Sequence, residues 1–526
     1  MSIKQILLLF FLSLTSFLQG QKYWLPFQPE NAIVNQYNDV SHPHFVHLDT
    51  SALKVPLFNA FKEFEVEWEK ANTIFLPLSD GSLSLFHILA SPIGEEGFAK
   101  RHTDLRTFLA RSKDKKYTAR LDWTKNGFHA YISGNSTTIL IDPIQGSKTS
   151  YIVYDLNDLQ RKLTFGCGTE MLNEVSNFEE STSSQAIGQN LRILRFAVST
   201  TGEFDRASIN DSQDALSTVI TLTNRLNAIF ERDLSTRFVL VEDNDQIIFT
   251  DPYTDPFTNS SGIILSNNIE TLDSIIGTSN YDVGHVLSAN ITGGVAGQAF
   301  LASVCSSSKG GAVSSFFDSN NVLGAQNGLL ETFAHEVGHQ LGAAHTWNNC
   351  GGGAQGQRSS GSAVEPGSGT TLMSYSGGCG SDNISPSIQY FHGFSIMQMN
   401  QVLNQESCEE ELETGNIPPT IVIQHPTGLT IPSNTPFELT AVATDPNGDQ
   451  LTYPREQFDI ALATALGFPV ENAPRFIALI PDTSGNWILT KRINLLLNRE
   501  APSEVLPIHD RDFEFSVVVR DNNPLG

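Results

Sequence analysis

The stretch that decides the fold reads Ala334-His335-Glu336-Val337-Gly338-His339-Gln340-Leu341-Gly342-Ala343-Ala344-His345. His335 and His339 are four residues apart, so on a helix they project from one face, one turn apart. Neutral imidazole is a preferred zinc ligand, and both rings can reach one ion. His345 would point elsewhere if the helix continued. Gly342 can adopt the left-handed conformation that ends a helix, which would make His345 the third ligand and leave the fourth position open for water.

Glu336 follows the first histidine and is too close to it in sequence to serve easily as another ligand. We expect it to act as general base, taking a proton from water that the metal has acidified and passing it to a leaving amine. The alternative is a helix with incidental histidines, because a bare His-Glu-x-x-His does occur by accident. The full pattern of five fixed positions is expected by accident in well below about one in a thousand chains of this composition, which favours the metal site.

This stretch resembles the zinc signature of the metzincin peptidases, which is followed downstream by a methionine turn. Gly369-Thr370-Thr371-Leu372-Met373-Ser374-Tyr375 supplies that turn. The resemblance implies that Met373 is not a ligand but packs its thioether beneath the histidines, whereas a lone methionine is otherwise usually core. Within the metzincins the chain resembles secreted reprolysin-like peptidases of bacterial type over about residues 190–410. Supporting stretches are Tyr281–Val286, Ala363–Gly369, Tyr390–His392, and farther on Asp445–Asp449 and Glu456–Asp459.

Tyr375 departs from the pattern of animal reprolysins, which usually carry a proline two residues after the methionine. A tyrosine stands there in astacin-like and serralysin-like metzincins. That likeness implies a side chain that leans toward the metal and stabilises the oxyanion, and a packed tyrosine is the alternative. We interpret His285 and His392 as structural, because three ligands and a water already satisfy a catalytic zinc.

The 526 residues exceed one ordinary domain, and we expect a multidomain chain. The predicted parts are a signal peptide (1–20), a β-rich propeptide domain with an exposed linker (21–187, the linker at 177–185), an α/β metzincin catalytic domain with a mixed twisted sheet and a zinc helix (188–412), and an immunoglobulin- or fibronectin-like β-sandwich that looks truncated (413–526). A signal peptide predicts secretion.

Several elements can be placed from local patterns. They are a hairpin of Tyr117–Trp123 and Phe128–Ile132, strands at Leu191–Ser199, Arg237–Val241 and Gln246–Phe249, a helix at Ser212–Arg232, and module strands at Thr420–Gln424, Phe437–Ala443 and Phe513–Val519. Signals between Asp251 and Gly311 are mostly loop-like.

The charge and apolar pattern exclude some partners. With 32 Lys and Arg against 57 Asp and Glu, the formal net charge is -25, which argues against nucleic acid and anionic lipid. After the first twenty residues no segment approaches twenty apolar residues, so we expect no membrane span.

Five cysteines bear on latency and on disulfides. Cys167, between Gly166 and Gly168, lies just before the linker, and a thiolate is a strong zinc ligand. Our hypothesis, which resembles the cysteine switch of reprolysin-like propeptides, is that Cys167 occupies the open zinc position in a proenzyme; a buried free cysteine is the alternative. The other four cysteines allow three pairings. The resemblance favours Cys305–Cys408 and Cys350–Cys379.

Asp445, Asn447 and Asp449 could offer oxygens to Ca²⁺ in the β-sandwich. The sequence Asp-Pro-Asn-Gly-Asp is also a good turn, and we favour the turn.

Together these patterns predict a secreted zinc endopeptidase that hydrolyses internal bonds of protein or peptide substrates and is made as a latent proenzyme, with the propeptide as intramolecular inhibitor. Two alternatives remain. One is a pappalysin-like zinc peptidase, which has a similar signature and differs in the loop between His345 and Met373. The other is a metal-binding but inactive adhesion protein, against which the retained Glu336 argues.

Overall fold

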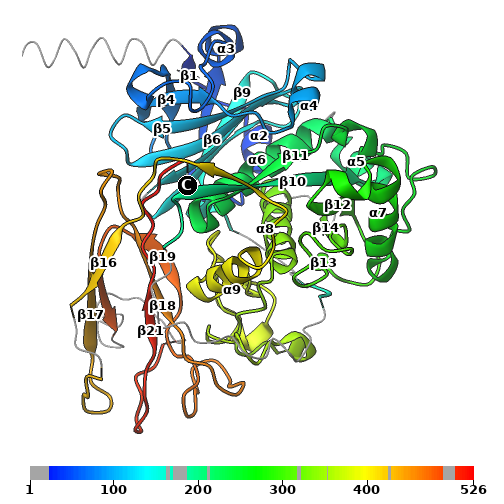
Figure 1. The fold of residues 1–526 in the computed structure, drawn as a ribbon. Coiled ribbons are helices and arrows are strands. Elements are labelled where there is room, and N and C mark those ends of the chain that lie inside the picture. The colour runs from blue at the N-terminus through cyan, green and yellow to red at the C-terminus, as the bar shows by residue number, and fades with distance from the viewer. Residues whose placement is uncertain are drawn as a thin grey trace, which may run out of the picture. The chain divides into compact units, whose positions relative to one another are not determined.

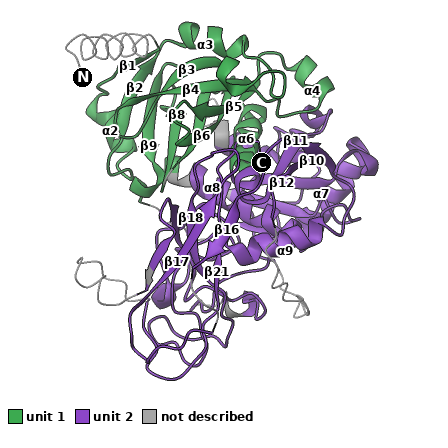
Figure 2. Ribbon diagram, turned by 60° about the vertical axis from the view of Figure 1, so that its left-hand side comes forward, with its two compact units in different colours: residues 1–160, 208–228, 320–323 green, residues 161–207, 229–319, 324–526 purple. Residues whose placement is uncertain are grey.

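The computed structural model describes residues 23–134, 136–160, 166–169, 186–209, 214–316, 322–351, 354–424, 428–489 and 504–525. It divides into two compact units (Figure 2): unit 1 is residues 1–160, 208–228 and 320–323, and unit 2 is the remainder. The predicted signal peptide and the linker at 177–185 lie outside the described residues and remain predictions.

Unit 1 is built on one nine-stranded antiparallel sheet of order β1-β2-β9-β8-β7-β6-β5-β4-β3. Its strands are β1 (Trp24–Pro26), β2 (His44–Leu48), β3 (Asn72–Pro77), β4 (Leu83–Ala90), β5 (Arg106–Ser112), β6 (Tyr117–Thr124), β7 (Gly127–Gly134), β8 (Thr137–Pro143) and β9 (Ser150–Asp155), accompanied by α2 (Asn31–Gln36), α3 (Thr50–Phe58), α4 (Glu96–Arg101), η1 (Trp68–Lys70) and η2 (Leu156–Asp158). Alternate residues such as Phe128, Ala130 and Ile132 of β7 enter one apolar core, as a pleated strand requires.

The predicted hairpin is confirmed as β6 and β7. Thr124 pairs with Gly127, whose φ of 124° suits glycine, so Lys125 and Asn126 form the two-residue loop.

Unit 2 contains a mixed six-stranded sheet, in which β11, β10, β12 and β14 run parallel and β13 and β15 antiparallel. The strands are β10 (Asn190–Thr200), β11 (Thr236–Leu240), β12 (Val283–Ala289), β13 (Gly297–Ala299), β14 (Ala312–Phe316) and β15 (Glu410–Glu413). The helices near them in the chain are α5 (Gly202–Ile209), α6 (Ala215–Leu234), α7 (Ser261–Ile275), α8 (Val322–Gln340) and α9 (Gly393–Leu403), with η3 (Asn244–Ile247), η4 (Thr278–Asn280), η5 (Ala354–Gln357) and η6 (Gly380–Asp382) (Figure 1).

The helix α6 belongs to both units, because its residues 215–228 are grouped with unit 1. Within unit 1, Arg225 forms a buried ion pair with Asp142 of β8, and Thr221 donates to Asp122 Oδ1 over 2.8 Å. The division therefore places part of the predicted catalytic domain with the sheet of the predicted propeptide.

The predicted strands at β10 and β11 and the predicted helix at α6 are confirmed, but one expectation for this part of the chain is wrong and one is incomplete. Gln246–Phe249 is not a strand: η3 lies there, and the side chain of Asn244 accepts from Val198 N and donates to Val198 O in place of a strand partner. Residues 251–311 are mostly loop by count, as expected, but they also contain α7 and β12, which the sequence did not assign. The buried face of α7 includes polar Asn268 and Thr271, which interrupt the apolar stripe that would have indicated a helix.

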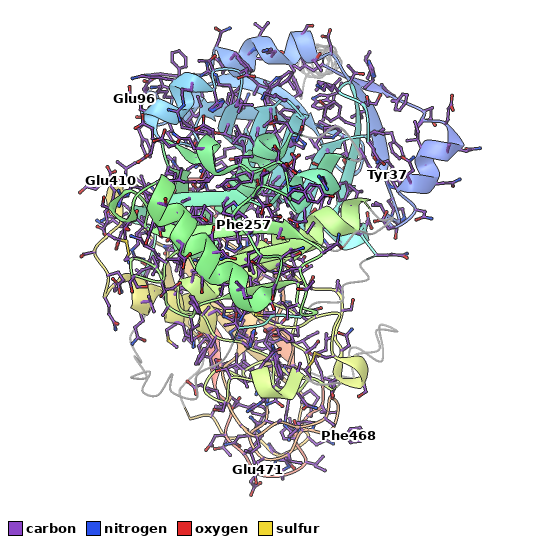
Figure 3. The ribbon with its side chains drawn as sticks, turned by 90° about the vertical axis from the view of Figure 1, so that its right-hand side faces the viewer. Tyr37, Glu96, Phe257, Glu410, Phe468 and Glu471 are labelled. Atoms are coloured by element: carbon purple, nitrogen blue, oxygen red, sulfur yellow. A yellow bond between two sulfur atoms is a disulfide. The ribbon has the colours of Figure 1, made fainter. Side chains whose placement is uncertain are left out.

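The last part of unit 2, from residue 413 on, is called the β-module below. Its two three-stranded sheets have the orders β16-β17-β20 and β19-β18-β21. The strands are β16 (Thr420–Ile423), β17 (Phe437–Thr444), β18 (Tyr453–Gln457), β19 (Leu479–Asp482), β20 (Asn486–Leu489) and β21 (Phe515–Val517), around a core that includes Phe476, Trp487 and Leu489. The three predicted strands are confirmed. In the view of Figure 3 the loop residues Phe468 and Glu471 lie at the end of the β-module away from Glu410 of β15.

Among the residues that the structure describes, no helix combines the length and apolar character needed to cross a membrane.

Candidate metal centre

Three histidine rings meet at the end of α8. The helix ends at Gln340, and Gly342 takes a φ of 105°, the left-handed turn expected from the sequence. A Cβ there would also lie 2.4 Å from Val402 Cγ2, so only glycine fits. The bend brings His345 Nε2 to 3.3 Å from His335 Nε2 and to 3.1 Å from His339 Nε2. Ligand nitrogens on one tetrahedral zinc, at bonds of roughly 2.0–2.1 Å, are about 3.3 Å apart, so the three atoms fit one ion.

The other ring nitrogens fix how these rings are oriented. The Nδ1 atoms of His335, His339 and His345 lie 2.7, 2.6 and 2.7 Å from the carbonyl oxygens of Leu372, Ala343 and Gln357. Because a carbonyl only accepts, each Nδ1 carries the proton and each Nε2 turns a lone pair toward the shared point.

Burial keeps the three rings neutral, which is their ligand form. All are 0 % exposed, and burial lowers the pKa of His345 to about 4 and those of His335 and His339 well below their usual value. The donor set, its orientation and its protonation therefore suit zinc.

Met373 lies beneath the zinc helix. A Cβ on Gly338, between the two helical histidines, would be 2.7 Å from Met373 Sδ and 3.1 Å from Phe391 Cε1. The neighbouring Leu372 supplies the carbonyl that orients His335. The methionine turn therefore supports α8 through contact at a glycine and through one backbone acceptor.

Glu336 lies beside the histidines and is fully buried. Its Oε2 accepts from Thr169 Oγ1 over 3.2 Å, and its Oε1 receives no N–H or O–H hydrogen bond from any described residue. A Cβ on Gly297 of β13 would lie 2.4 Å from Oε1, so glycine lets the edge strand approach the carboxylate. Burial raises the pKa of Glu336 to about 8, against the opposing hydrogen bonds of Cys167 and Thr169. A carboxyl group poised near neutrality can both take up and release a proton.

Cys167 completes the group around the histidines. Its Sγ lies 3.6 Å from His339 Nε2, and the ligand atoms of Cys167, His335, His339 and His345 all lie within 4.8 Å of one another. The flanking backbone runs parallel to β13: Ala296 N donates to Gly166 O over 2.6 Å, and Gly168 N to Gly297 O over 2.8 Å. Burial, with the nearby Glu336 carboxylate, raises the pKa of the thiol well above its usual value.

Tyr375 faces the same group. Its ring centroid lies 4.8 Å from that of His345, and its hydroxyl donates to Gln357 Oε1 over 2.8 Å, with Cys167 O 3.4 Å away. Burial raises the pKa of Tyr375 well above its usual value, so the hydroxyl keeps its proton. Gln357 in turn donates through Nε2 to Cys167 O.

Sequence reasoning missed several residues of this centre. Gln357 lies in a stretch rich in glycine, serine and glutamine, where no spacing distinguishes it. Thr169 follows Cys167 without a motif of its own. Glu365 was noted only within a family stretch. Its buried carboxylate accepts from Thr346 Oγ1 at 2.6 Å, Thr371 Oγ1 at 2.5 Å and Thr370 N at 2.9 Å. It thus ties the chain after His345 to the methionine turn.

The disulfides that the family resemblance favoured are confirmed as Cys305–Cys408 and Cys350–Cys379, and Cys167 is left as a free, buried cysteine.

His285 and His392 lie in other surroundings. The nitrogens of His285 contact Gln340 Oε1 at 3.2 Å and Ser314 Oγ at 3.0 Å. Burial lowers the pKa of His285 to about 3. His392 precedes α9, where its Nδ1 accepts from Phe394 N over 3.1 Å.

Residues Asp445–Asp449, the candidate calcium site, form a turn that is hydrogen-bonded by residues from elsewhere in the β-module. Asp445 Oδ1 accepts from Asp449 N over 2.7 Å, and Asn447 Oδ1 accepts from Ile417 N over 2.8 Å. The sequence did not single out two further residues: Asn523, which donates to Asp449 Oδ2 over 2.9 Å, and Asp521. Burial raises the pKa of Asp521 to about 6, with a contribution from the charges of Asp445 and Asp449.

Part of the chain matches a known family. Residues 190–402 match the family model described as "Metallo-peptidase family M12B Reprolysin-like". Over these residues the chain matches the reprolysin-like metallopeptidases, so the reprolysin-like resemblance found in the sequence is confirmed, while its bacterial type remains a prediction. The family implies a metal, typically zinc, and zinc-dependent proteolysis of peptide substrates.

Two curated proteins of Mus musculus are similar to part of the chain. They are "Disintegrin and metalloproteinase domain-containing protein 1a" and "Disintegrin and metalloproteinase domain-containing protein 1b", each 30% identical over 146 residues. The match covers 27% of this chain and 17% and 16% of those proteins, so the chain matches about a sixth of their length. A solved structure titled "Structure of a chaperone-substrate complex" aligns with 52% of this chain and 38% of its own at 11% identity, with a TM-score of 0.24, which has no bearing on the fold.

Proposed function

We propose that the chain is a secreted zinc endopeptidase of the reprolysin-like family, made as a latent proenzyme. The observation that supports this most is the convergence of three neutral imidazole Nε2 atoms beside the buried carboxylate of Glu336. When bound, zinc supplies Lewis acidity, which acidifies water and polarises a carbonyl group.

In this proposal Glu336 is the general base and then the general acid. It takes a proton from the attacking water and delivers it to the leaving amine, for which a pKa near 8 is suitable. Tyr375 keeps its hydroxyl proton and donates a hydrogen bond to the oxygen that becomes negative as the peptide bond is attacked.

The edge strand β13 supplies main-chain groups for an extended peptide. Ala296 N and Gly297 O bond the backbone of Gly166 and Gly168. We propose that a substrate uses the same edge once residues 166–169 have left, because main-chain bonds hold a peptide whatever its sequence.

Latency is assigned to Cys167. The thiol lies among the histidines, and Thr169 donates to Oε2 of Glu336, the proposed base. The segment around Cys167 therefore covers the metal ligands and the base together. Loss of Cys167's thiol proton on metal binding would convert it to the stronger thiolate ligand.

The proposal of secretion is supported by the apolar stretch Ile6–Phe17 and by two disulfides, which persist in oxidising compartments. Mass spectrometry of the protein recovered outside expressing cells should show a mature amino terminus within residues 170–190, both disulfides and one zinc.

The decisive test is Glu336→Gln, which removes the base and keeps the shape. We expect turnover of casein to fall roughly 10²–10⁴-fold, with the zinc content and thermal midpoint of the parent. A parent protein that binds stoichiometric zinc and, after removal of residues up to the linker, cleaves neither casein nor gelatin would favour the inactive adhesion protein instead.

Calcium is proposed as a second ion, held by the β-module at Asp445, Asn447 and Asp449 and joined by Asp521. Burial raises the pKa of Asp521 to about 6 and the charges of Asp445 and Asp449 add to the rise, a repulsion that a bound cation would relieve. The turn formed by the same residues is the alternative that the sequence favours, and thermal midpoints with and without Ca²⁺ separate the two.

A further inference from the structure

The residues that complete the centre lie on a segment with little regular structure. Residues 345–382 carry His345, Gln357 and Tyr375, yet within the described residues of the segment regular structure is limited to η5 and η6. Backbone that lacks helix or strand bonds must find other partners if its side chains are to stay in place. Glu365 and the disulfide Cys350–Cys379 provide some of them.

A loop of the β-module, residues 461–466, provides others. Asn348, three residues after His345, donates through Nδ2 to Leu462 O over 3.2 Å and accepts from Thr464 N over 2.9 Å. At the far end of the segment, Asp382 Oδ1 accepts from Leu466 N over 2.9 Å. Asn348 is 1 % exposed and Asp382 6 %, so these bonds are shielded from water.

The same loop reaches the neighbour of Gln357. Arg358 donates through Nη2 to Ala461 O and through Nε to Asn348 O over 2.8 Å. Loop 461–466 therefore contacts the segment just after His345, next to Gln357, and beyond Tyr375.

Side chains of the β-module pack directly on two glycines of the metallopeptidase region. A Cβ on Gly367 would lie 2.9 Å from Leu466 Cδ1, and a Cβ on Gly393 would lie 2.7 Å from both Glu456 Oε2 and Val518 Cγ2. Such distances are below van der Waals contact, so the packing of these surfaces depends on the missing Cβ atoms.

A second set of contacts leads to α8. Glu456 Oε2 accepts from Gly393 N over 2.7 Å. Arg520 donates to Phe391 O over 3.1 Å and pairs with the buried Asp233 through Nε over 2.7 Å. The Phe391 ring held in this way lies against Gly338, between the two helical histidines.

We propose that the β-module is part of the metal centre's own framework: loop 461–466 positions the segment that carries His345, Gln357 and Tyr375, and Glu456 with Arg520 positions Phe391 beneath the zinc helix. The inference rests on the proposed function in taking the histidines as metal ligands. Its residues are positioning residues, since none touches the histidine rings.

The test uses the full chain with three variants of the β-module. Leu466→Ala empties the space over Gly367, Glu456→Ala removes the acceptor for Gly393 N, and Glu456→Gln keeps an acceptor at that place. Asp482→Asn is the matched control, because it breaks an ion pair with Arg455 inside the β-module and touches neither set of contacts.

Two readouts are independent of peptidase activity: the rate at which zinc passes to an excess of a chromogenic chelator, and hydrogen exchange of peptides from residues 345–382. We expect Leu466→Ala and Glu456→Ala each to speed zinc loss roughly tenfold, as loss of outer partners of metal ligands does. Both should speed exchange, Leu466→Ala in 345–382 and Glu456→Ala in peptides around Phe391. Glu456→Gln and Asp482→Asn should behave like the parent.

The inference is overturned if the double variant Leu466→Ala, Glu456→Ala loses zinc and exchanges hydrogen at the parent's rates, or if Asp482→Asn accelerates both as much as the contact variants do. A parent without stoichiometric zinc would contradict the proposed function, while the exchange comparison would still decide whether the β-module holds the segment.

Discussion

The helix α8 and the segment 345–382 hold the two halves of one centre in different ways. His335 and His339 are fixed by a regular helix, so a spacing of four residues suffices to bring them together. His345, Gln357 and Tyr375 are fixed by a glycine bend, a buried carboxylate, a disulfide and the β-module loop 461–466, which is distant in sequence. The first half is local and the second half depends on the tertiary fold.

The largest loss of stability is expected when segment 345–382 loses the buried carboxylate of Glu365. Glu365→Ala leaves Thr346, Thr370 and Thr371 without their buried acceptor, which should lower the free energy of unfolding by roughly 2–4 kcal/mol. Glu365→Gln retains an acceptor and should lose less. Denaturant unfolding of the full chain measures this, and equal stability of Glu365→Ala and parent would contradict the role of Glu365.

Tyr375 tests whether the irregular segment, residues 345–382, takes part in the chemistry. Tyr375→Phe removes the hydroxyl and keeps the ring, so kcat should fall roughly 10²-fold with KM little changed. Tyr390→Phe, whose ring lies on Arg232, is the control and should have the parent's kcat. An unchanged kcat in Tyr375→Phe would leave Tyr375 as a packing residue.

Cys167→Ser in the uncleaved chain tests whether the thiol among the three histidines is the proposed latency ligand. A hydroxyl is a poorer zinc ligand than a thiolate, so peptidase activity should rise roughly tenfold above the parent, the change that about 1.4 kcal/mol of lost binding produces. Should the variant stay as inactive as the parent, Cys167 is not the latency ligand.

The smallest expected effect concerns the β-module. Burial raises the pKa of Asp521 in the folded chain to about 6, above its ordinary value of 3.8, so the fold binds this proton more tightly than the unfolded chain. Its contribution to stability is therefore full below pH 3.8 and is lost as pH rises through 6. In calcium-free buffer at pH 7, Asp521→Asn should stabilise the β-module by about 1 kcal/mol, a value reduced for partial exposure.

Added Ca²⁺ separates the two interpretations of that cluster. If Asp445, Asp449 and Asp521 hold the ion, millimolar Ca²⁺ should raise the parent's thermal midpoint. The midpoint of Asp521→Asn should rise less. Equal midpoints with and without Ca²⁺ would leave the turn as the whole explanation.

The same contrast explains what the sequence could predict. The helical histidine pair of α8, the bend at Gly342 and the β6–β7 hairpin depend on residues close together in the chain, and each was found from its pattern. The disulfide pairs and the methionine turn came from family resemblance, because four cysteines alone leave three pairings open. Gln357, Thr169 and Glu365 act through contacts with residues distant in sequence or without a spacing rule, so no local pattern could assign them. The polar buried face of α7 concealed a helix for a related reason: Asn268 is buried because it binds Ser199 and Gly310, neither of which is near in sequence.

Gly367 and Gly393 have a consequence for chimeric proteins. The missing side chain of Gly367 leaves room for Leu466, and that of Gly393 leaves room for Glu456 and Val518. A foreign domain fused after residue 412 would bring no matching side chains, so both glycines would stay uncovered and Asp233 would lose Arg520, keeping its bonds from Arg232 and Phe391 N. Exchange of this domain between relatives is therefore constrained. It should succeed only when the two glycines and the β-module side chains that pack on them are exchanged together.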